Sequence, residues 1–184
     1  FGTGLEPDLQ AKKDFWEFDP ATDVWTRKMD YPILMTYATA FSMNEMGYFA
    51  MGKQDAVYYK MLCRYDPVND LWKQMSSNPG KSSSMDSPGF VINGKAYVPA
   101  AGEMYEYDPA SDHWTKKAYP EALGYFGGGS AFSINGKGYL GVGWVMEKSS
   151  NVSDFFEYDP ETETWTRKAG FPGTPRSNAT SFSL

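Results

Sequence analysis

Only a few residues of this chain could do chemistry, and the most reactive types occur singly. His113 is the sole histidine and Cys63 the sole cysteine. With no second histidine, neither a histidine-based metal site nor a Ser-His-Asp triad is convincing. One cysteine cannot form an intrachain disulfide. We therefore expect no cofactor and no metal ion, and the sequence nominates no catalytic residue.

Paired aspartates offer a second chemistry, calcium binding. Asp66 with Asp70, and Asp108 with Asp112, place carboxylates at a short spacing that suits calcium. The first aspartate of each pair precedes a proline, however, and an Asp-Pro step favours a turn in which the carboxylate accepts backbone N–H bonds. The Asp-x-Asp-x-Asp-Gly pattern is absent. These carboxylates are expected to shape turns.

Two glycine-containing stretches partly match the sequence patterns of phosphate-binding loops but do not meet their other requirements. Residues 136–141 read Gly-Lys-Gly-Tyr-Leu-Gly and match the dinucleotide fingerprint, but they open a strand, whereas a phosphate site needs a helix N-terminus. Residues 80–82 read Gly-Lys-Ser like the end of a P-loop, yet Met75 stands where the first glycine is required. Neither stretch is expected to bind a nucleotide.

The elements that must position any site come from an internal repeat. A tryptophan follows each of four Asp-Pro aspartates at a spacing of six residues, and the aspartates lie 47, 42 and 51 residues apart. The pairs are Asp19 with Trp25, Asp66 with Trp72, Asp108 with Trp114, and Asp159 with Trp165. This period is in the range of propeller repeats.

Each copy predicts four short strands, a to d. Strand a is a Phe-x-x-Asn stretch, followed in two copies by the hairpin signals Asn93-Gly94 and Asn135-Gly136. Strand b carries a tyrosine and ends at a glycine, strand c leads into the Asp-Pro turn, and strand d carries the tryptophan. Cys63 aligns with aromatic residues of strand c and is expected to pack in the core.

A four-stranded unit of about 45 residues in tandem is typical of a propeller blade. The Tyr-Asp-Pro turn, the tryptophan at fixed spacing, the tyrosine before the glycine of strand b and Pro175-Arg176 before the last strand a resemble kelch repeats of the galactose oxidase/kelch superfamily, most of all those of bacterial exported and surface proteins. Strand b departs from the kelch pattern of a closing glycine pair, since the copies read Gly2-Thr3-Gly4, Met51-Gly52, Ala101-Gly102 and Gly141-Val142-Gly143. The copper chemistry of galactose-oxidase-like relatives needs two histidines, which this chain does not have.

The resemblance implies an all-β, kelch-like β-propeller with four-stranded antiparallel blades and four repeats in a single region, 1–184. The expected parts are strands b to d of one blade over 1–28, blades over 38–75, 89–117 and 130–169, and a strand a over 178–184 that closes the first blade or opens the next. An unclosed array would expose sheet edges. We therefore expect closure by the terminal strand, further blades or self-association.

Strand alternation places the short a–b and c–d turns on one side of the disc and the variable b–c and d–a loops on the other, which we call the loop face. Variable loops on a rigid scaffold are where binding usually resides. Aromatic residues and one arginine there suit sugar stacking or a protein hot spot. The candidate ligand-binding residues are Tyr31, Tyr37, Tyr58, Tyr59, Tyr125, Phe126, Trp144 and Arg176.

Charge and hydropathy exclude other partners. The net charge is −6, with 17 basic and 23 acidic residues, which argues against nucleic acid as a partner. No apolar run has the length of a membrane-spanning helix. The chain begins at Phe1 without a leader, so we expect that a signal was removed or that the chain is a piece of a longer one.

Three functions remain open. The favoured one is a non-enzymatic binding or scaffold module whose loop face recognises a protein or a glycan. The first alternative is a carbohydrate-active enzyme resembling the kelch-type sialate mutarotases, for which Arg176 and Glu121 are the only candidates. The second is a purely structural repeat segment of a larger surface protein. The resemblance to bacterial relatives implies an exported location, periplasmic, surface or secreted.

Overall fold

The structure is a computed structural model that describes residues 1–4, 10–81 and 88–183. These residues form strands and two short 3-10 helices. The strands are β1 (Phe15–Asp19), β2 (Val24–Lys28), β3 (Thr39–Met43), β4 (Met46–Gln54), β5 (Val57–Asp66), β6 (Leu71–Met75), β7 (Phe90–Ile92), β8 (Lys95–Ala100), β9 (Glu103–Asp108), β10 (His113–Lys117), β11 (Phe126–Gly127), β12 (Ser130–Ile134), β13 (Lys137–Gly141), β14 (Trp144–Val145), β15 (Ser150–Asn151), β16 (Phe155–Asp159) and β17 (Thr164–Arg167). The helices are η1 (Glu121–Leu123) and η2 (Met146–Lys148).

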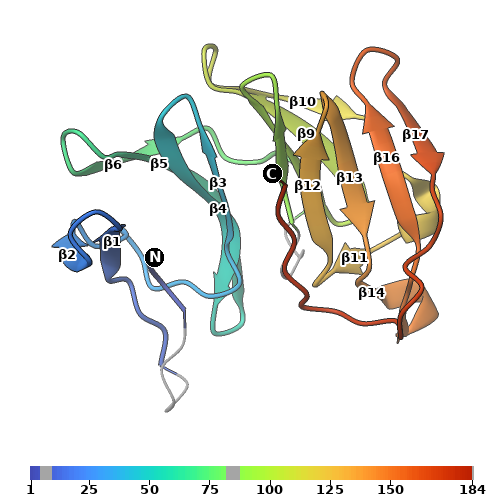
Figure 1. The fold of residues 1–184 in the computed structure, drawn as a ribbon, viewed down its shortest axis with the longest axis horizontal. Coiled ribbons are helices and arrows are strands. Elements are labelled where there is room, and N and C mark those ends of the chain that lie inside the picture. The colour runs from blue at the N-terminus through green and yellow to red at the C-terminus, as the bar shows by residue number, and fades with distance from the viewer. Residues whose placement is uncertain (5–9, 82–87, 184) are drawn as a thin grey trace.

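Four antiparallel sheets follow one another as the blades of a propeller (Figure 1). Blade 1 is β1 and β2, with a bridge from Gly2 to Phe15 where strand b is expected to end. Blade 2 is β3-β4-β5-β6, blade 3 is β7-β8-β9-β10, and blade 4 is β12-β13-β16-β17. A smaller sheet, β11-β14-β15, lies below blade 4. The expected all-β propeller with antiparallel blades is confirmed.

The a–b hairpins turn where the sequence places Asn-Gly. Asn93 and Gly94 have φ of 50° and 73°, and Asn135 and Gly136 have 51° and 72°. Positive φ at both central residues is the requirement of a type I′ turn, which matches the twist of the flanking strands. These turns set the register that places Phe90 opposite Tyr97 and Phe132 opposite Tyr139.

The c–d turns are shaped by the Asp-Pro aspartates. The carboxylate of each accepts the backbone N–H two residues later, at 2.8 to 2.9 Å. At Asp108 this bond, from Ala110, lowers the pKa of the carboxyl group. These bonds show the turn role expected for the four aspartates, and Asp108 and Asp159 also form ion pairs with Lys95 and Lys137.

The repeated tryptophans join neighbouring blades. In blades 2, 3 and 4 the indole N–H of this tryptophan donates to a carbonyl of the preceding blade, and the acceptor lies four residues after that blade's own tryptophan. The pairs are Trp72 with Met29 (2.9 Å), Trp114 with Ser76 (2.7 Å) and Trp165 with Ala118 (2.8 Å). The same backbone setting at three boundaries shows that these residues fix the spacing and angle between blades.

The core lies mainly between the blades. Tyr107 and Trp114 of blade 3 share one cluster with Tyr48 and Leu62 of blade 2. Blades 3 and 4 meet in a second cluster that contains Tyr97 and Tyr158, whose rings lie 5.4 Å apart. Cys63 is fully buried, and burial raises the pKa of its thiol, as expected for a packed and unreactive cysteine.

The b–c connection of blade 2 consists mostly of strand, although the sequence predicts variable loops at these connections. β4 and β5 remain paired to their ends, with Lys53 opposite Tyr58 and Gln54 opposite Val57. A register shift between Ala50 and Gly52 interrupts the pairing only locally. Valine and two tyrosines favour strand, so the two strands extend beyond the blade as a hairpin.

The C-terminal residues 178–183 form no strand, whereas the sequence predicts strand a over 178–184, of which residue 184 lies outside the described residues. They run beside the start of β12, where Asn178 N donates to Gly128 O at 2.6 Å. In Figure 1 the red C-terminal trace returns to the middle of the molecule. This position keeps the segment with blade 4 rather than with the first blade.

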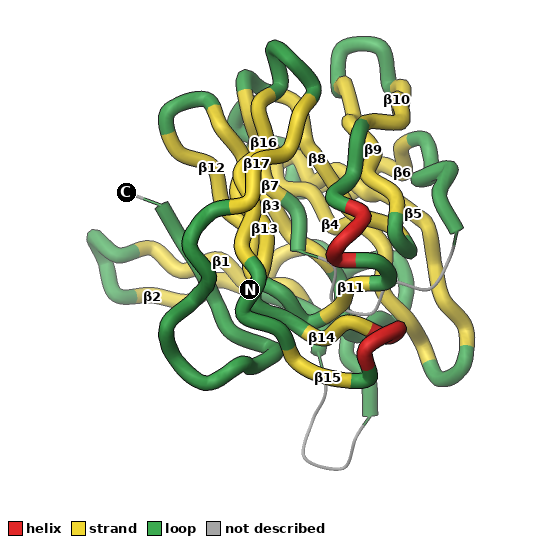
Figure 2. Tube along the Cα trace, turned by 90° about the vertical axis from the view of Figure 1, so that its right-hand side faces the viewer, coloured by secondary structure: helices red, strands yellow, loops and turns green. Residues whose placement is uncertain are grey.

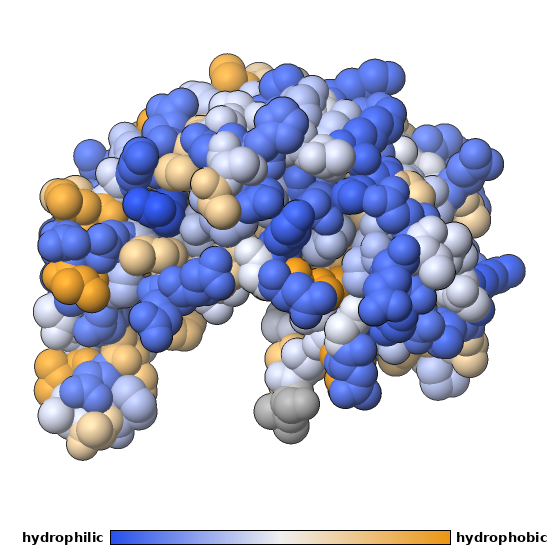
Figure 3. All heavy atoms as spheres, turned by 90° about the horizontal axis from the view of Figure 1, so that it is seen from above, coloured by the Kyte–Doolittle hydropathy of each residue, from blue (hydrophilic) through white to orange (hydrophobic). Residues whose placement is uncertain are grey.

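The four blades form an open arc in the described part of the chain. Neither a hydrogen bond nor a ring contact joins blade 1 to blade 4 among the described residues. Figure 2 shows β1 and β2 as a separate hairpin, and Figure 3 shows the surface deeply indented between two limbs. Among the described residues, no helix is long and apolar enough to cross a membrane.

Candidate functional site

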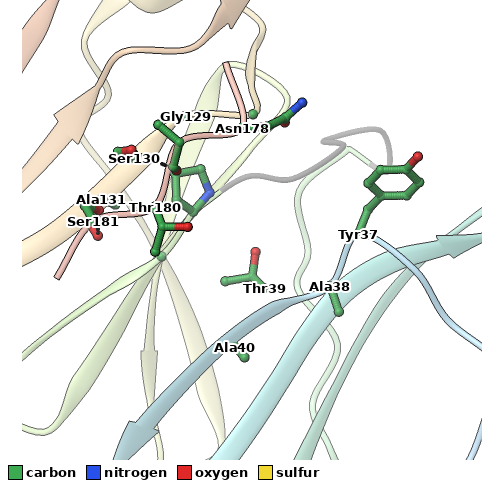
Figure 4. A pocket seen from close by; sticks show the side chains of 14 residues that line it. Tyr37, Ala38, Thr39, Ala40, Gly129, Ser130, Ala131, Asn178, Thr180 and Ser181 are labelled. Atoms are coloured by element: carbon green, nitrogen blue, oxygen red, sulfur yellow. Dashed lines mark hydrogen bonds between the residues drawn. The ribbon is translucent and has the colours of Figure 1, made fainter. Parts of the chain in front are cut away.

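A central groove of about 540 Å³ opens where the inner strands of three blades begin. Its walls come from the start of β3, from the residues before β7, from the start of β12 and from the C-terminal segment (Figure 4). The lining residues are Tyr37, Ala38, Thr39, Ala40, Pro88, Gly89, Gly128, Gly129, Ser130, Ala131, Asn178, Ala179, Thr180 and Ser181. The d–a loops enter the blades at these strand starts, so the groove belongs to the loop face.

The chemistry of the groove is neutral and polar. None of its described lining residues is Asp, Glu, Lys, Arg, His or Cys. Small side chains expose the main chain, and hydroxyl and amide groups stand among them. Such a surface can donate and accept hydrogen bonds, but it offers no strong acid, base or nucleophile pair for catalysis.

The C-terminal segment shows how the groove holds a polypeptide. Ser130 Oγ donates to Ala179 O at 3.1 Å, and Ser181 Oγ donates to Ala131 O at 2.9 Å. With the bond from Asn178 N to Gly128 O, these contacts fasten the segment along the inner edge of blade 4. The wall opposite, β3, is also the edge strand of its sheet. An edge strand presents backbone donors and acceptors to whatever lies beside it.

Aromatic residues of the loop face gather near Tyr37, which is part of the groove lining. Tyr37 lines it and is 42% exposed, and the Lys53 ammonium lies 4.8 Å from the centre of its ring. Lys53 is opposite Tyr58 in the extended β4–β5 hairpin. Burial and then the nearby Tyr58 raise the pKa of Tyr125. The structure therefore brings Tyr37, Tyr58 and Tyr125 into one neighbourhood.

Trp144 joins this neighbourhood through the small sheet. It pairs with Gly127 of β11, next to Tyr125 and Phe126, and its side chain is 43% exposed. The Tyr125 N–H donates to both carboxylate oxygens of Glu147 at 3.0 and 2.9 Å. This contact ties the d–a loop of residues 118–129 to the b–c loop that contains η2.

Other candidate residues lie elsewhere. Tyr31 is fully buried among Cys63, Phe49 and Trp72, and Phe126 is 1% exposed, so both side chains belong to the core instead of the surface. The sequence placed both at the surface because residue type alone does not distinguish an exposed aromatic side chain of a loop from one that packs in the core.

The remaining candidates do not line the groove: Arg176 is exposed, and Tyr59 is partly buried against the cluster of Tyr31 and Cys63. Tyr59 donates to Gln54 Oε1 at 3.4 Å within its own hairpin. Arg176 donates to Thr174 O at 3.1 Å, and its guanidinium lies 5.1 Å from the ring centre of Phe171. Glu121, in η1, is not a lining residue either.

Sequence reasoning missed the polar residues that line the groove. Thr39 and Ser130 are small polar residues at strand starts, and Asn178 and Ser181 lie in the C-terminal segment, so a search for aromatic and charged side chains does not select them. The signal that could have found them is the run Gly127-Gly128-Gly129, since three glycines before a strand favour close approach of another backbone.

Metal ligands do not gather in the described residues, where no three His, Cys, Asp or Glu side chains lie together. Asp70 and Asp112 have specific hydrogen bonds instead. Asp70 Oδ1 accepts from Met29 N at 2.8 Å and from Tyr65 Oη at 2.7 Å, and Asp112 Oδ1 accepts from Ser76 N and Tyr107 Oη, both at 2.9 Å. His113 is an exposed residue of β10.

Comparison with known proteins supports a kelch-type propeller. No family model matches the chain. Over 81 residues, 44% of the chain, it is 35% identical to kelch-like protein 24 of Rattus norvegicus and, equally, of Mus musculus. The chain spans 12% of the length of these curated relatives.

A solved structure shares the fold. The protein in "Structure of YjhT" superposes with a TM-score of 0.75 over 94% of this chain and 63% of that one, at 18% sequence identity. At this identity the likeness concerns the fold alone. The kelch-like relative and the repeated blades together support the kelch-type assignment.

Proposed function

We propose that the chain is a non-enzymatic binding module that holds an extended segment of a partner protein in the central groove. One observation carries the proposal: residues 178–181 already lie along the inner edge of blade 4, held through Gly128, Ser130 and Ala131. Backbone hydrogen bonds to an edge strand are a common way to bind an extended peptide, while side-chain pockets supply specificity.

The composition of the groove favours binding over turnover. Its described lining is neutral, and the candidate pair for a sugar-acid enzyme, Arg176 and Glu121, stands outside it. Tyr37, Tyr58 and Trp144 would supply specificity at the rim, because tyrosine and tryptophan bury large areas at low entropic cost and are common at hot spots. The alternative is a purely structural role, for which a binding experiment should find no ligand.

The test is a selection against two libraries, a display library of random peptides and a glycan array. The wild-type chain should enrich a set of related extended peptides. Ala40→Arg, which places a long charged side chain on the β3 wall, should lose that enrichment, and Tyr37→Ala should weaken it. Val68→Arg is the matched control, since Val68 is 88% exposed in the c–d turn of blade 2.

Each outcome decides between the functions. Peptide enrichment that survives Ala40→Arg would place binding outside the groove and reject the proposal. Enrichment of glycans alone would favour a carbohydrate-binding role, and no enrichment of either would favour a structural repeat. We also propose the exported location that the bacterial type of repeat implies, and cell fractionation of the source would test it.

A further inference from the structure

Every blade presents three register positions to the blade before it, and we call this its leading surface. The positions hold Phe49, Tyr65 and Trp72 in blade 2, Val98, Tyr107 and Trp114 in blade 3, Leu140, Tyr158 and Trp165 in blade 4, and Phe1, Phe18 and Trp25 in blade 1. In blade 2 all three rings contact Phe15 of blade 1, at centroid distances of 4.8 to 6.0 Å. The leading surface is therefore an established inter-blade contact.

Blade 1 has this surface with nothing packed on it in the described residues. Phe1 is 82%, Phe18 38% and Trp25 48% exposed, whereas Tyr107 and Trp114 at the equivalent positions are 0% and 7% exposed. Within the described residues, the ring contacts of Phe1 and Phe18 are both with Trp25, in their own blade. Neither the Trp25 indole N–H nor the Asp23 carboxylate has a hydrogen-bond partner among the described residues. Their equivalents, Trp114 Nε1 and Asp112, both bond to Ser76.

Blade 4 presents the complementary trailing surface, formed by Phe132, Tyr139 and Phe155. The three rings are stacked, with Tyr139 5.1 Å from Phe132 and 5.7 Å from Phe155, and all three remain partly exposed. The equivalent residues of blade 3 are Phe90, Tyr97 and Met104, which are 3%, 3% and 0% exposed.

The burial in blade 3 has an identified cause. Tyr158 lies 5.4 Å from Tyr97, and Trp165 lies 6.4 Å from Phe90, so the leading surface of blade 4 covers the trailing surface of blade 3. The trailing surface of blade 4 is built from the same register positions without such a cover in the described residues.

We propose that these two surfaces bind each other between two copies of this chain, so that blade 1 of one copy docks on blade 4 of the other. By the repeat, Trp25 Nε1 would donate to the carbonyl of Ala169, and Asp23 would accept the Ala169 N–H, because Ala169 follows Trp165 by the same four residues as Ser76 follows Trp72. This contact continues the interface already formed at three blade boundaries.

The charges at the two surfaces are also complementary. At the boundary of blades 3 and 4, Lys117 forms an ion pair with Glu163. The equivalent positions of the proposed contact are Lys168 and Asp23, which again have opposite charge. We infer a second copy as the occupant because it brings the two surfaces together in the register of the existing blade boundaries and pairs these opposite charges. Such head-to-tail contacts close into rings or extend as open arrays.

The experiment measures mass in solution over a dilution series by light scattering, and it does not depend on the groove ligand. The wild-type chain should exceed its monomer mass of 20.6 kDa at high concentration. Trp25→Asp breaks the leading surface and Phe155→Asp breaks the trailing surface, so each variant alone should stay a monomer. Val68→Asp, at an exposed turn residue, should assemble as the wild type does.

Mixing the two broken variants is the decisive step. The mixture retains one intact leading surface and one intact trailing surface, so it should form a one-to-one heterodimer with a twofold mass and no larger species. Heterodimer formation also proves that both variants are folded. A wild type that is monomeric at every concentration, assembly that survives either substitution, or a mixture of folded variants that stays monomeric would each overturn the proposal.

Discussion

Blades 2 and 3 meet differently from blades 3 and 4, although both boundaries come from the same repeat. At the first, Asp112 accepts the Ser76 N–H and the Tyr107 hydroxyl, both at 2.9 Å. At the second, Glu163 occupies the equivalent position and pairs with Lys117 instead. The Tyr158 hydroxyl, equivalent to that of Tyr107, is buried and makes no hydrogen bond to any described residue.

The contacts that the two boundaries share indicate what holds neighbouring blades together, and the contacts that differ indicate what can vary. Both boundaries keep the tryptophan bond to the preceding blade, at 2.7 Å for Trp114 and 2.8 Å for Trp165, and both keep the stacked Phe-Tyr pair on the trailing side. Only the carboxylate network changes. We infer that apolar burial with the tryptophan bond holds the arc together, and that the carboxylate adds to it.

The largest expected effect is at the tryptophan. Trp114 is 7% exposed, so Trp114→Ala should lower the free energy of unfolding by about 3–5 kcal/mol, through lost burial and the cavity it leaves. Trp25→Ala, at the same register position with 48% exposure, should change it far less in dilute protein. Urea unfolding followed by circular dichroism measures both, and equal losses would contradict the assignment of the tryptophan to blade contacts.

Removal of the carboxylate should have the next largest effect. Asp112→Ala leaves the Ser76 N–H and the Tyr107 hydroxyl without their acceptor, which should cost about 1–3 kcal/mol. Glu163→Ala removes an exposed ion pair, and such pairs contribute about 0–1 kcal/mol. The comparison fails if Glu163→Ala costs as much as Asp112→Ala in the same unfolding experiment.

The sequence predicted the blades well because the repeat is local. Asn-Gly pairs and Asp-Pro steps impose their turns through φ and short-range hydrogen bonds, so Asn93, Asn135 and the four turn aspartates behave as expected. The spacing of six residues likewise places each tryptophan opposite the aromatic residue of strand c, as Trp114 lies opposite Tyr107.

The site was less predictable because it depends on contacts between distant segments. Tyr31 is buried by Cys63 and Trp72, and no local sequence pattern predicts this burial. The path of residues 178–183 is set by Gly128 and Ser130, about fifty positions earlier, in place of the strand that the repeat predicts. Only Tyr37 of the predicted ligand-binding residues lines the groove, while Tyr58, Tyr125 and Trp144 lie on the same face.

Acid should weaken the blade boundaries that depend on the carboxylates of Asp70 and Asp112. Burial opposes ionisation of Asp112, but the hydrogen bonds from Ser76 and Tyr107 lower the pKa of its carboxyl group below 3.8, and the Met29 N–H lowers that of Asp70 likewise. Because the folded pKa lies below the unfolded one, this stability is complete above pH 3.8 and is lost as the pH falls through the folded values.

The measurement is the urea midpoint as a function of pH, for the wild type and for Asp70→Asn with Asp112→Asn. The wild type should lose more stability below pH 3.8 than the double variant, because the amides do not titrate. Parallel curves would show that these two carboxylates contribute nothing specific to acid unfolding.

Loss of a single hydroxyl should distinguish the two boundaries. Tyr107→Phe removes the bond to Asp112 and should cost about 1 kcal/mol. Tyr158→Phe removes a buried hydroxyl with no described partner, so it should be neutral or slightly stabilising. Thermal unfolding of the two variants side by side gives the answer, and a loss at Tyr158 equal to that at Tyr107 would mean that its hydroxyl is bonded after all.

The smallest expected change in stability comes from giving the boundary of blades 3 and 4 the carboxylate network of the boundary of blades 2 and 3. Glu163→Asp shortens the side chain to that of Asp112, at a position where φ is 54° and aspartate tolerates the left-handed region better than glutamate. The new carboxylate should accept the Tyr158 hydroxyl and the Ala118 N–H, as Asp112 accepts those of Tyr107 and Ser76. Since the Lys117 pair is lost, the net gain should be about 0.5 kcal/mol. The gain should vanish in the Tyr158→Phe background, because a stabilisation that persists without the hydroxyl would come from relief of backbone strain and not from the rebuilt network.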